Sequence, residues 1–155
     1  MADIINNIVG GRYYILELIG RGGSAIVYKA RDIHNGGIYA LKKYITSDPA
    51  NRKRLLEGME RELEVLKNCT HPVLPKIFDL IKIEDAFFLV MEYIDGIDLK
   101  KYVDEYGTLS TEMLVKVMEQ VCSGFYYLHS LSPAIVYRDL KPANIILCKD
   151  GRIKL

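Results

Sequence analysis

The sequence predicts an α+β fold, in which a five-stranded antiparallel sheet with one main helix is followed by the beginning of a helical part. Three observations support this prediction. Short β-rich runs alternate with turn signals near the start of the chain. Helical spacing of apolar residues then begins over Arg52–Lys67 and returns over Thr111–His129. Strands therefore come mostly before helices, which is typical of α+β proteins.

Five runs rich in apolar, β-branched and aromatic residues are typical of strands: Tyr13–Gly20, Ile26–Arg31, Ile38–Ile45, Lys76–Ile83 and Phe87–Tyr93. Asn35-Gly36-Gly37 separates the second run from the third and predicts a tight turn. The last two runs are expected to form a hairpin across Glu84-Asp85-Ala86. A second hairpin is expected near the end of the chain, around Lys149-Asp150-Gly151, between Ile145–Cys148 and Arg152–Leu155.

Three helices are expected. The Arg52–Lys67 helix has four apolar residues at helical spacing, Leu55, Met59, Leu63 and Leu66. Asp98 is a candidate N-cap for a short helix over Leu99–Tyr106. The long Thr111–His129 helix carries one wide apolar stripe, formed by Leu114, Val117, Met118, Val121, Phe125 and Leu128.

Composition is that of an ordinary soluble protein and excludes some classes of function. Hydrophobic residues make up 50% of the 155 residues, and the formal net charge is +1. This balance gives no general attraction to nucleic acid or to anionic membranes. Met1–Asn7 lacks the pattern of a signal peptide, and Cys69, Cys122 and Cys148 fit no metal-binding spacing. We therefore expect a cytoplasmic protein with reduced thiols, with a membrane anchor beyond Leu155 left open.

A glycine-rich segment, Gly20-Arg21-Gly22-Gly23-Ser24, lies between the first two expected strands. Glycines let backbone N–H groups approach phosphate oxygens because they lack a Cβ. The Ile26–Arg31 run that follows alternates like a strand, which argues against a dinucleotide-binding fold, and no Gly-Lys-Ser/Thr is present for a Walker A loop. The segment is therefore either an ordinary tight turn or a flap over a nucleotide.

Lys42 and Glu62 are a candidate ion pair. Ala40 and Lys42 are two residues apart on a strand and face the same side, where Ala40 leaves room for a flat ring. Glu62 lies in the apolar stripe of the Arg52–Lys67 helix, where a carboxylate is costly unless it is paired. Pairing would aim the ammonium group at a phosphate. The alternatives are a solvated strand lysine and a glutamate that reaches water from the edge of the stripe.

The most specific segment is Tyr137-Arg138-Asp139-Leu140-Lys141-Pro142-Ala143-Asn144. Phosphoryl transfer to a hydroxyl needs a carboxylate that orients the nucleophile and accepts its proton, and Asp139 suits this role. Lys141 can neutralise charge on the transferring group. Asn144 can offer an oxygen to Mg²⁺, which prefers oxygen ligands. Together these residues predict a catalytic loop.

From about Arg12 to Leu155 the chain resembles a Hanks-type serine/threonine protein kinase. The resemblance is carried by the glycine-rich segment, by Tyr39-Ala40-Leu41-Lys42, by Glu62 nine residues before His71-Pro72, by Val90-Met91-Glu92-Tyr93 and by the catalytic loop. Arg-Asp-Leu-Lys-x-x-Asn is the serine/threonine form of that loop. Gly11-Arg12-Tyr13 and Ala30-Arg31-Asp32 are similar to bacterial members.

The resemblance implies a protein-kinase-like fold, with an N-lobe over residues 1–94 and the start of a C-lobe over residues 95–155. It implies transfer of the γ-phosphate of ATP to a protein Ser/Thr hydroxyl, with ATP and Mg²⁺ as cofactors. The catalytic residues would be Asp139, Lys141, Lys42 and Glu62, and the metal ligand Asn144. The nucleotide-binding residues would be Ile19, Gly20, Gly22, Gly23, Ser24, Val27, Ala40, Lys42, Met91, Glu92, Ile94, Asp98 and Ile146.

Within this set the resemblance implies particular roles. Met91 would be the gatekeeper, and the backbone of Glu92 and Ile94 would bind the adenine edge. Asp98 would either contact the ribose or cap the following helix. The residues that would sandwich the ring are Ile19, Val27, Ala40 and Ile146.

The sequence departs from the family pattern in three places. Ala25 replaces the third glycine of the loop, and Tyr137 replaces the usual histidine before Arg-Asp. The sequence also ends at Leu155, about where Asp-Phe-Gly should follow, so we expect a truncated kinase with little or no activity alone. Two alternatives are a non-catalytic nucleotide-binding or interaction module of kinase ancestry and a related small-molecule phosphotransferase. Lys141 argues against the second.

Because few elements follow the Thr111–His129 helix, its apolar stripe is expected to lie exposed. Burial of such a stripe is strongly favourable. We therefore expect the chain to self-associate through this helix, with Val117, Val121 and Phe125 between two copies, to swap segments with a second copy, or to stay partly disordered beyond about Asp95. The alternative is a compact monomer whose helix folds back onto the strand-rich part.

Overall fold

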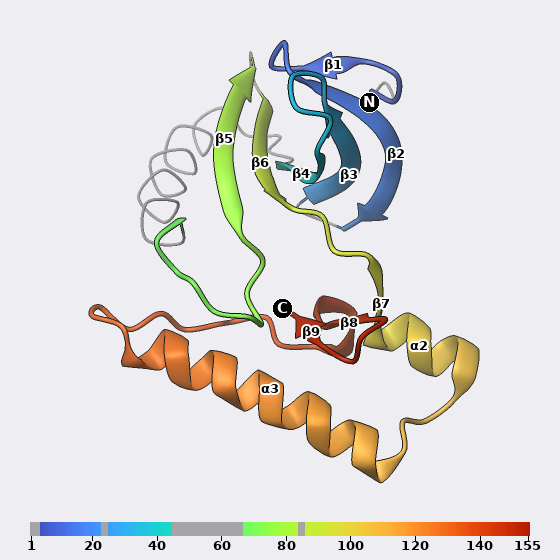
Figure 1. Cartoon of the computed structure of the whole chain (residues 1–155), viewed down its shortest axis with the longest axis vertical. Helices are drawn as coiled ribbons and strands as arrows, with labels where there is room; N and C mark the ends of the chain where they lie inside the picture. Colours follow the sequence, from blue (N-terminus) through green and yellow to red (C-terminus); the bar gives the residue numbers. More distant parts are fainter. Residues whose placement is uncertain (1–3, 23–24, 45–66, 84–85) are drawn as a thin grey trace. The chain divides into compact units, whose positions relative to one another are not determined.

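The computed structural model describes residues 4–22, 25–44, 67–83 and 86–155 (Figure 1). The expected helix over Arg52–Lys67, apart from its last residue, lies outside the described residues. The chain divides into two compact units, and each is described by itself. The first unit comprises Met1–Cys69 and Lys76–Tyr93, and the second comprises Thr70–Pro75 and Ile94–Leu155.

The first unit contains one antiparallel sheet with the strand order β1-β2-β3-β4-β6-β5 (Figure 1). Its strands are β1 (Ile8–Val9), β2 (Tyr13–Arg21), β3 (Ala25–Asp32), β4 (Ile38–Tyr44), β5 (Ile77–Ile83) and β6 (Ala86–Glu92). The five predicted strands are confirmed. β1 is an addition, because a two-residue strand is too short to show the alternation that reveals a strand in a sequence.

One face of this sheet forms the core of the first unit. The buried residues are Val9, Tyr13, Ile15, Ile26, Tyr28, Ala30, Leu41, Phe88 and Val90. Because side chains alternate between the two faces of a strand, Val27, Lys29, Ala40 and Lys42 lie on the opposite face. The sheet therefore separates a hydrophobic core from the face that carries the candidate nucleotide-binding residues.

An ion pair between buried Asp32 and Arg12, whose side chain is 42% exposed, ties the start of the sheet to the turn after β3. Asp32 is fully buried, and it accepts hydrogen bonds from Arg12 Nε (2.8 Å) and from the backbone N–H of His34 (2.9 Å). The hydrogen bond from Arg12 is the main reason that the pKa of Asp32 is lowered, and the N–H of His34 adds to it. The carboxylate therefore stays ionised within the sheet.

The second unit has two helices, α2 (Leu99–Tyr106) and α3 (Thr111–Ser130), and a small sheet. Both helices begin at a side-chain cap, since Asp98 accepts from the N–H of Lys101 (2.9 Å) and Ser110 from that of Met113 (3.2 Å). The predicted cap at Asp98 is thus confirmed. No helix among the described residues is long and apolar enough to span a membrane.

The small sheet has the order β7-β8-β9, formed by β7 (Gly96–Asp98), β8 (Ile146–Cys148) and β9 (Ile153–Lys154). The late hairpin is confirmed, whereas β7 is an addition, because a strand of three residues is too short to show alternation in the sequence. Gly96 allows this pairing, since a Cβ there would lie 2.5 Å from the carbonyl oxygen of Leu147.

Part of the apolar stripe of α3 is covered within the second unit, which corrects the expectation that the whole stripe is exposed. Val117 and Val121 are buried in a cluster with Val73, Leu99, Ile145 and Ile153. The backbone N–H of Leu155 donates to the carbonyl of Val73 (2.9 Å), so segments far apart in sequence meet at the helix. Val117 and Val121 therefore cannot form an interface between copies unless the unit opens.

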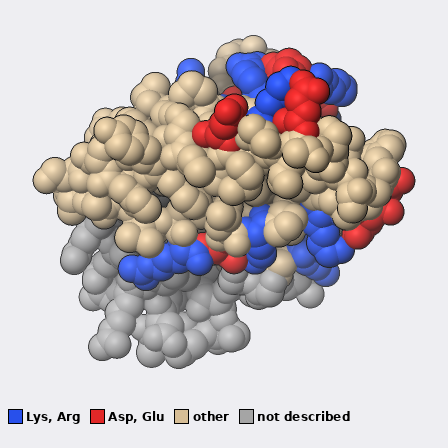
Figure 2. Space-filling view, turned by 90° about the horizontal axis from the view of Figure 1, so that it is seen from below, with Lys and Arg blue, Asp and Glu red and all other residues tan. Residues whose placement is uncertain are grey.

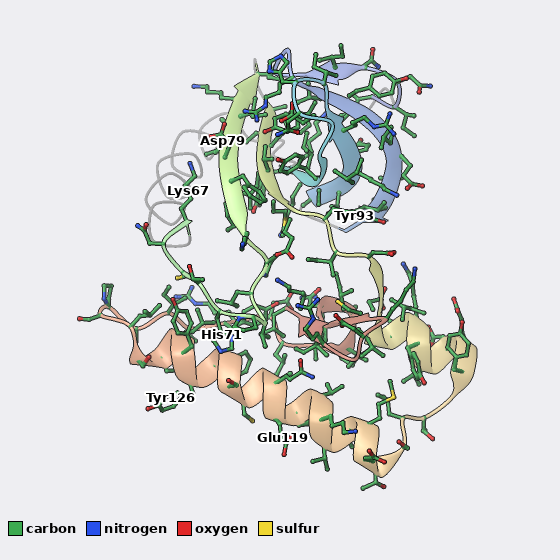
Figure 3. All side chains as sticks on the ribbon, in the orientation of Figure 1. Lys67, His71, Asp79, Tyr93, Glu119 and Tyr126 are labelled. Carbon is green, nitrogen blue, oxygen red and sulfur yellow. The ribbon has the colours of Figure 1, made fainter. Side chains whose placement is uncertain are left out.

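One edge of the same stripe, with Leu114 and Met118, remains exposed together with the adjoining surface of α3. The apolar residues there have exposed fractions of 47% for Leu114, 51% for Val115, 43% for Met118 and 79% for Tyr126. Figure 2, which views the molecule from below, shows a band of uncharged residues between two rows of charged ones. Figure 3 shows Tyr126 and Glu119 pointing away from the helix.

Candidate active site

The glycine-rich segment connects β2 to β3, as expected for a flap. Gly20 pairs with Val27 and Arg21 with Ile26, and the N–H of Gly22 donates to the carbonyl of Ala25 (2.8 Å). The register of β2 shifts between Leu18 and Gly20, which leaves Ile19 as an unpaired bulge residue. Gly23 and Ser24, two of the expected nucleotide-binding residues, lie outside the described residues.

Lys42 lies on β4, in a row of directly paired residues that runs across β3, β4 and β6. Val27 on β3 pairs with Lys42, and Lys42 pairs with Leu89 on β6. The side chain of Lys42 is half-buried, and its Nζ lies 5.4 Å from the ring centroid of Tyr44. Glu62 lies outside the described residues, so the Lys42–Glu62 ion pair stays a prediction.

Ala40 and Met91 form the next row of the same face. The two residues pair directly between β4 and β6, and Ala40 is 5% exposed. The short side chain of Ala40 takes up little room beside Met91 on this face. This placement agrees with the expected roles of Ala40 and Met91, which themselves stay predictions.

Glu92 ends β6 and is held by Lys76 through two backbone groups. The N–H of Glu92 donates to the carbonyl of Lys76 (2.8 Å), and the N–H of Lys76 donates to Glu92 Oε2 (3.0 Å). Any contact of the Glu92 backbone with a base would therefore use its carbonyl oxygen. Nothing in the sequence around Lys76 indicates that it binds the Glu92 side chain, because the two residues are 16 positions apart. Ile94 belongs to the second unit.

The catalytic-loop residues come together in the second unit. Lys141 Nζ donates to both carboxylate oxygens of Asp139, at 2.9 and 2.7 Å. Asn144 Nδ2 donates to the carbonyl oxygen (2.8 Å) and to Oδ2 (2.9 Å) of the same residue. A short 3-10 helix, η1 (Pro142–Asn144), turns the chain so that Asn144 reaches back to Asp139. The structure thus brings Asp139, Lys141 and Asn144 into contact, while their catalytic and metal-binding roles stay predictions.

The carboxylate of Asp139 is oriented but open to solvent. The side chain of Asp139 is 68% exposed and that of Lys141 is 52% exposed. A carboxylate that is fixed by two neighbours and still accessible can accept a hydrogen bond from an incoming hydroxyl. This arrangement is suited to orienting a nucleophile.

Tyr137, the unusual residue of the loop, has a structural role. Its ring lies 5.6 Å from that of Phe125 on α3, measured between centroids. Burial, helped by the charge of Asp139, raises the pKa of Tyr137, so the phenol stays neutral. The loop is thereby attached to α3 just before Asp139.

Asp98 and Ile146 lie opposite each other in the β7–β8 pairing. The Asp98 carboxylate is used as the cap of α2 and also lies 3.4 Å from Lys101 Nζ. The cap explains Asp98 without a ligand, and a ribose contact stays a prediction. Ile146 is half-buried in β8, directly after the catalytic loop.

Comparisons with known proteins show the family of the chain. The sequence profile of the protein kinase domain matches residues 13–155. Serine/threonine-protein kinase PrkC of Bacillus subtilis is 36% identical over 152 residues, which cover 98% of this chain and 23% of that protein. The probable serine/threonine-protein kinase PknB of Lactococcus lactis is 30% identical and covers 97% of the chain and 24% of that protein. The chain thus spans about a quarter of the length of these relatives.

A solved structure shares the fold. Rad53 residues 1–466 in complex with AMP-PNP superimposes with a TM-score of 0.80 and 30% sequence identity, over 93% of this chain and 37% of that one. The similarity extends over both units of the chain.

Proposed function

Since the chain belongs to the protein kinase domain family, we propose that it is part of a serine/threonine protein kinase that transfers the γ-phosphate of ATP to a protein hydroxyl. The observation that carries this proposal is the Asp139 carboxylate, fixed by Lys141 and Asn144 yet open to solvent. The proposal is also supported by similar bacterial proteins whose names describe them as serine/threonine-protein kinases.

Asp139 accepts the hydrogen bond of the substrate hydroxyl and takes its proton as the new P–O bond forms and the bond to the leaving oxygen breaks. Lys141, which contacts both carboxylate oxygens, stabilises negative charge on the transferring phosphoryl group. Because the loop holds both side chains in place beforehand, little reorganisation is needed during the reaction.

The nucleotide would lie on the sheet face of the first unit that bears Val27, Ala40 and Lys42. The half-buried ammonium group of Lys42 would contact phosphate oxygens, while Ala40 and Val27 would contact the base. The backbone N–H groups of the glycine-rich segment would add further donors. AMP-PNP, an ATP analogue, is the ligand named for the similar Rad53 structure.

Asn144 is the described residue that we propose as a ligand of Mg²⁺. Its amide nitrogen donates to Asp139, so the side-chain oxygen is the end left to bind a hard cation. When bound, Mg²⁺ would neutralise negative charge on the phosphate groups of ATP.

An assay with labelled ATP tests the proposed function. The protein that carries this sequence should bind ATP and label Ser or Thr side chains of an acceptor protein. ATP binding without any transfer would instead favour a non-catalytic nucleotide-binding module.

We further propose that copies of this chain associate through the exposed side of α3. The support is the row of exposed apolar residues on that side, Leu114, Val115, Met118 and Tyr126. A cytoplasmic location stays a prediction.

A further inference from the structure

Three side chains of the first unit meet beside the end of β6: Glu17 on β2, Lys29 on β3 and Tyr93 directly after β6. Lys29 Nζ lies 3.1 Å from Glu17 Oε1 and 4.7 Å from the ring centroid of Tyr93. Figure 3 labels Tyr93 in the connection that leaves β6. Lys29 thus links two neighbouring strands to a residue that belongs to neither.

The register of the sheet sets this arrangement. Glu17 pairs directly with Lys29, because β2 bulges on either side of Glu17, between Ile15 and Glu17 and between Leu18 and Gly20. Directly paired residues face the same side of an antiparallel sheet. The bulges therefore bring a carboxylate next to the Lys29 ammonium group on the face that carries Ala40.

The side chain of Lys29 is more buried than that of its partner Glu17, with exposed fractions of 27% and 56%. The hydrogen bond to Glu17, followed by contact with Tyr93, raises the pKa of Lys29, so the ammonium group is retained at neutral pH. A cation of this kind attracts the face of an aromatic ring.

Tyr93 lies where the strand pairing of β6 has ended. β6 runs over Ala86–Glu92, and Glu92 is its last residue in register with β4. The contact with Lys29 therefore holds Tyr93, the first residue after β6, against the sheet.

We propose that Lys29, held by Glu17, is a positioning residue for the nucleotide base: it holds Tyr93 and thereby sets the backbone at Glu92–Tyr93 that meets the adenine edge. The inference rests on the proposed ATP site. It assigns Lys29 no contact with the phosphates or with the reacting atoms.

Dissociation constants for ATP test this role, measured for the unaltered chain and for Lys29→Met, Lys29→Arg and Lys82→Met. Removing the charge should weaken ATP binding about fivefold, and arginine, which also pairs with carboxylates and stacks on aromatic rings, should restore it to within about twofold. Lys82 is an exposed lysine on β5 and serves as the matched control. Equal affinity of Lys29→Met and the unaltered chain would overturn the inference.

Hydrogen exchange of backbone amides separates positioning from general stability. Lys29→Met should speed exchange at residues 92–93 and leave the amides of β3 and β4 unchanged. Faster exchange throughout the sheet, with no rescue by Lys29→Arg, would show a merely structural role and contradict the inference.

Lys42→Met distinguishes this inference from the proposed function. If the unaltered chain binds ATP and Lys42→Met weakens binding while Lys29→Met does not, only the role of Lys29 is wrong. If the unaltered chain does not bind ATP, the proposed function and this inference fail together.

Discussion

Lys141 donates to both carboxylate oxygens of Asp139, at 2.9 and 2.7 Å, two residues along the same loop. Such a contact fixes the carboxylate plane and places a positive charge beside the position where a phosphoryl group would react. Three predictions concern this site and the first unit, and two concern α3.

In the full-length protein that carries this sequence, Asp139→Asn should nearly abolish phosphoryl transfer while leaving ATP affinity unchanged. Asparagine keeps the size and much of the hydrogen bonding but cannot take a proton, and loss of a general base typically costs roughly 10²–10⁴-fold in rate. Initial rates with labelled ATP provide the measurement. Asp95→Asn removes an exposed carboxylate paired with Lys149 (3.0 Å) and should have no effect. Equal rates for Asp139→Asn and the unaltered protein would refute the assignment.

Lys42→Met should weaken ATP binding and remove transfer, because an apolar chain of similar length replaces the proposed phosphate contact. Glu62→Gln should also weaken ATP binding and transfer, because Lys42 would lose the carboxylate that is expected to pair with it. If the two residues form an ion pair, the double variant should be little worse than either single one. Fully additive losses in the dissociation constant or rate would show that the pair does not form.

Asp32→Asn should destabilise the protein at neutral pH. The pKa of Asp32 is lowered in the folded state, so its contribution to stability is present above the unfolded value of about 3.9 and is lost as the pH falls through the lower folded value. The difference in urea midpoint between the two proteins should therefore shrink below about pH 4. A difference that is constant across this range would contradict the ion-pair interpretation.

Val121→Ala should cost about 2 kcal/mol of stability, because it removes buried methyl groups and leaves a cavity. Val121 is 1% exposed, whereas Val115, on the same helix, is 51% exposed. Val115→Ala is therefore the matched control and should change stability by less than about 0.5 kcal/mol. Urea unfolding measures both, and similar values would mean that α3 is packed differently.

Association through α3 should appear in light scattering as a molar mass that rises with concentration. Met118→Glu places a charge within the exposed apolar row and should lower that mass. Tyr106→Ser removes an aromatic residue that is 68% exposed on α2 and should have no effect. A mass that stays at the monomer value at every concentration would exclude self-association.

The sequence predicted the elements of the fold well where local pattern determines them. Strand alternation identified β2 to β6, and Asp98 was recognised as a helix cap. Asp139, Lys141 and Asn144 were singled out from one short segment, and because they are near neighbours in sequence the loop brings them into contact.

Features that depend on distant segments were missed. The stripe of α3 was expected to be exposed, because helical periodicity shows that a face is apolar but does not show what covers it. Val73 and Ile153, which cover part of it, are remote in the sequence from Val121. The contact of Lys29 with Tyr93 was missed for the same reason, and only alternation on β3 hinted that Lys29 shares a face with Val27.

The assignment of Thr70–Pro75 to the second unit means that the polypeptide passes between units three times. A protein fragment that starts at Ile94 would omit Val73, whose carbonyl accepts from Leu155 (2.9 Å), and Thr70, whose N–H donates to the Tyr127 hydroxyl (2.9 Å). Gly124, where a Cβ would lie 3.2 Å from Val73, would then face a gap. If the second unit is expressed by itself, residues 70–75 should therefore be added to residues 94–155, either by fusion or as a separate peptide.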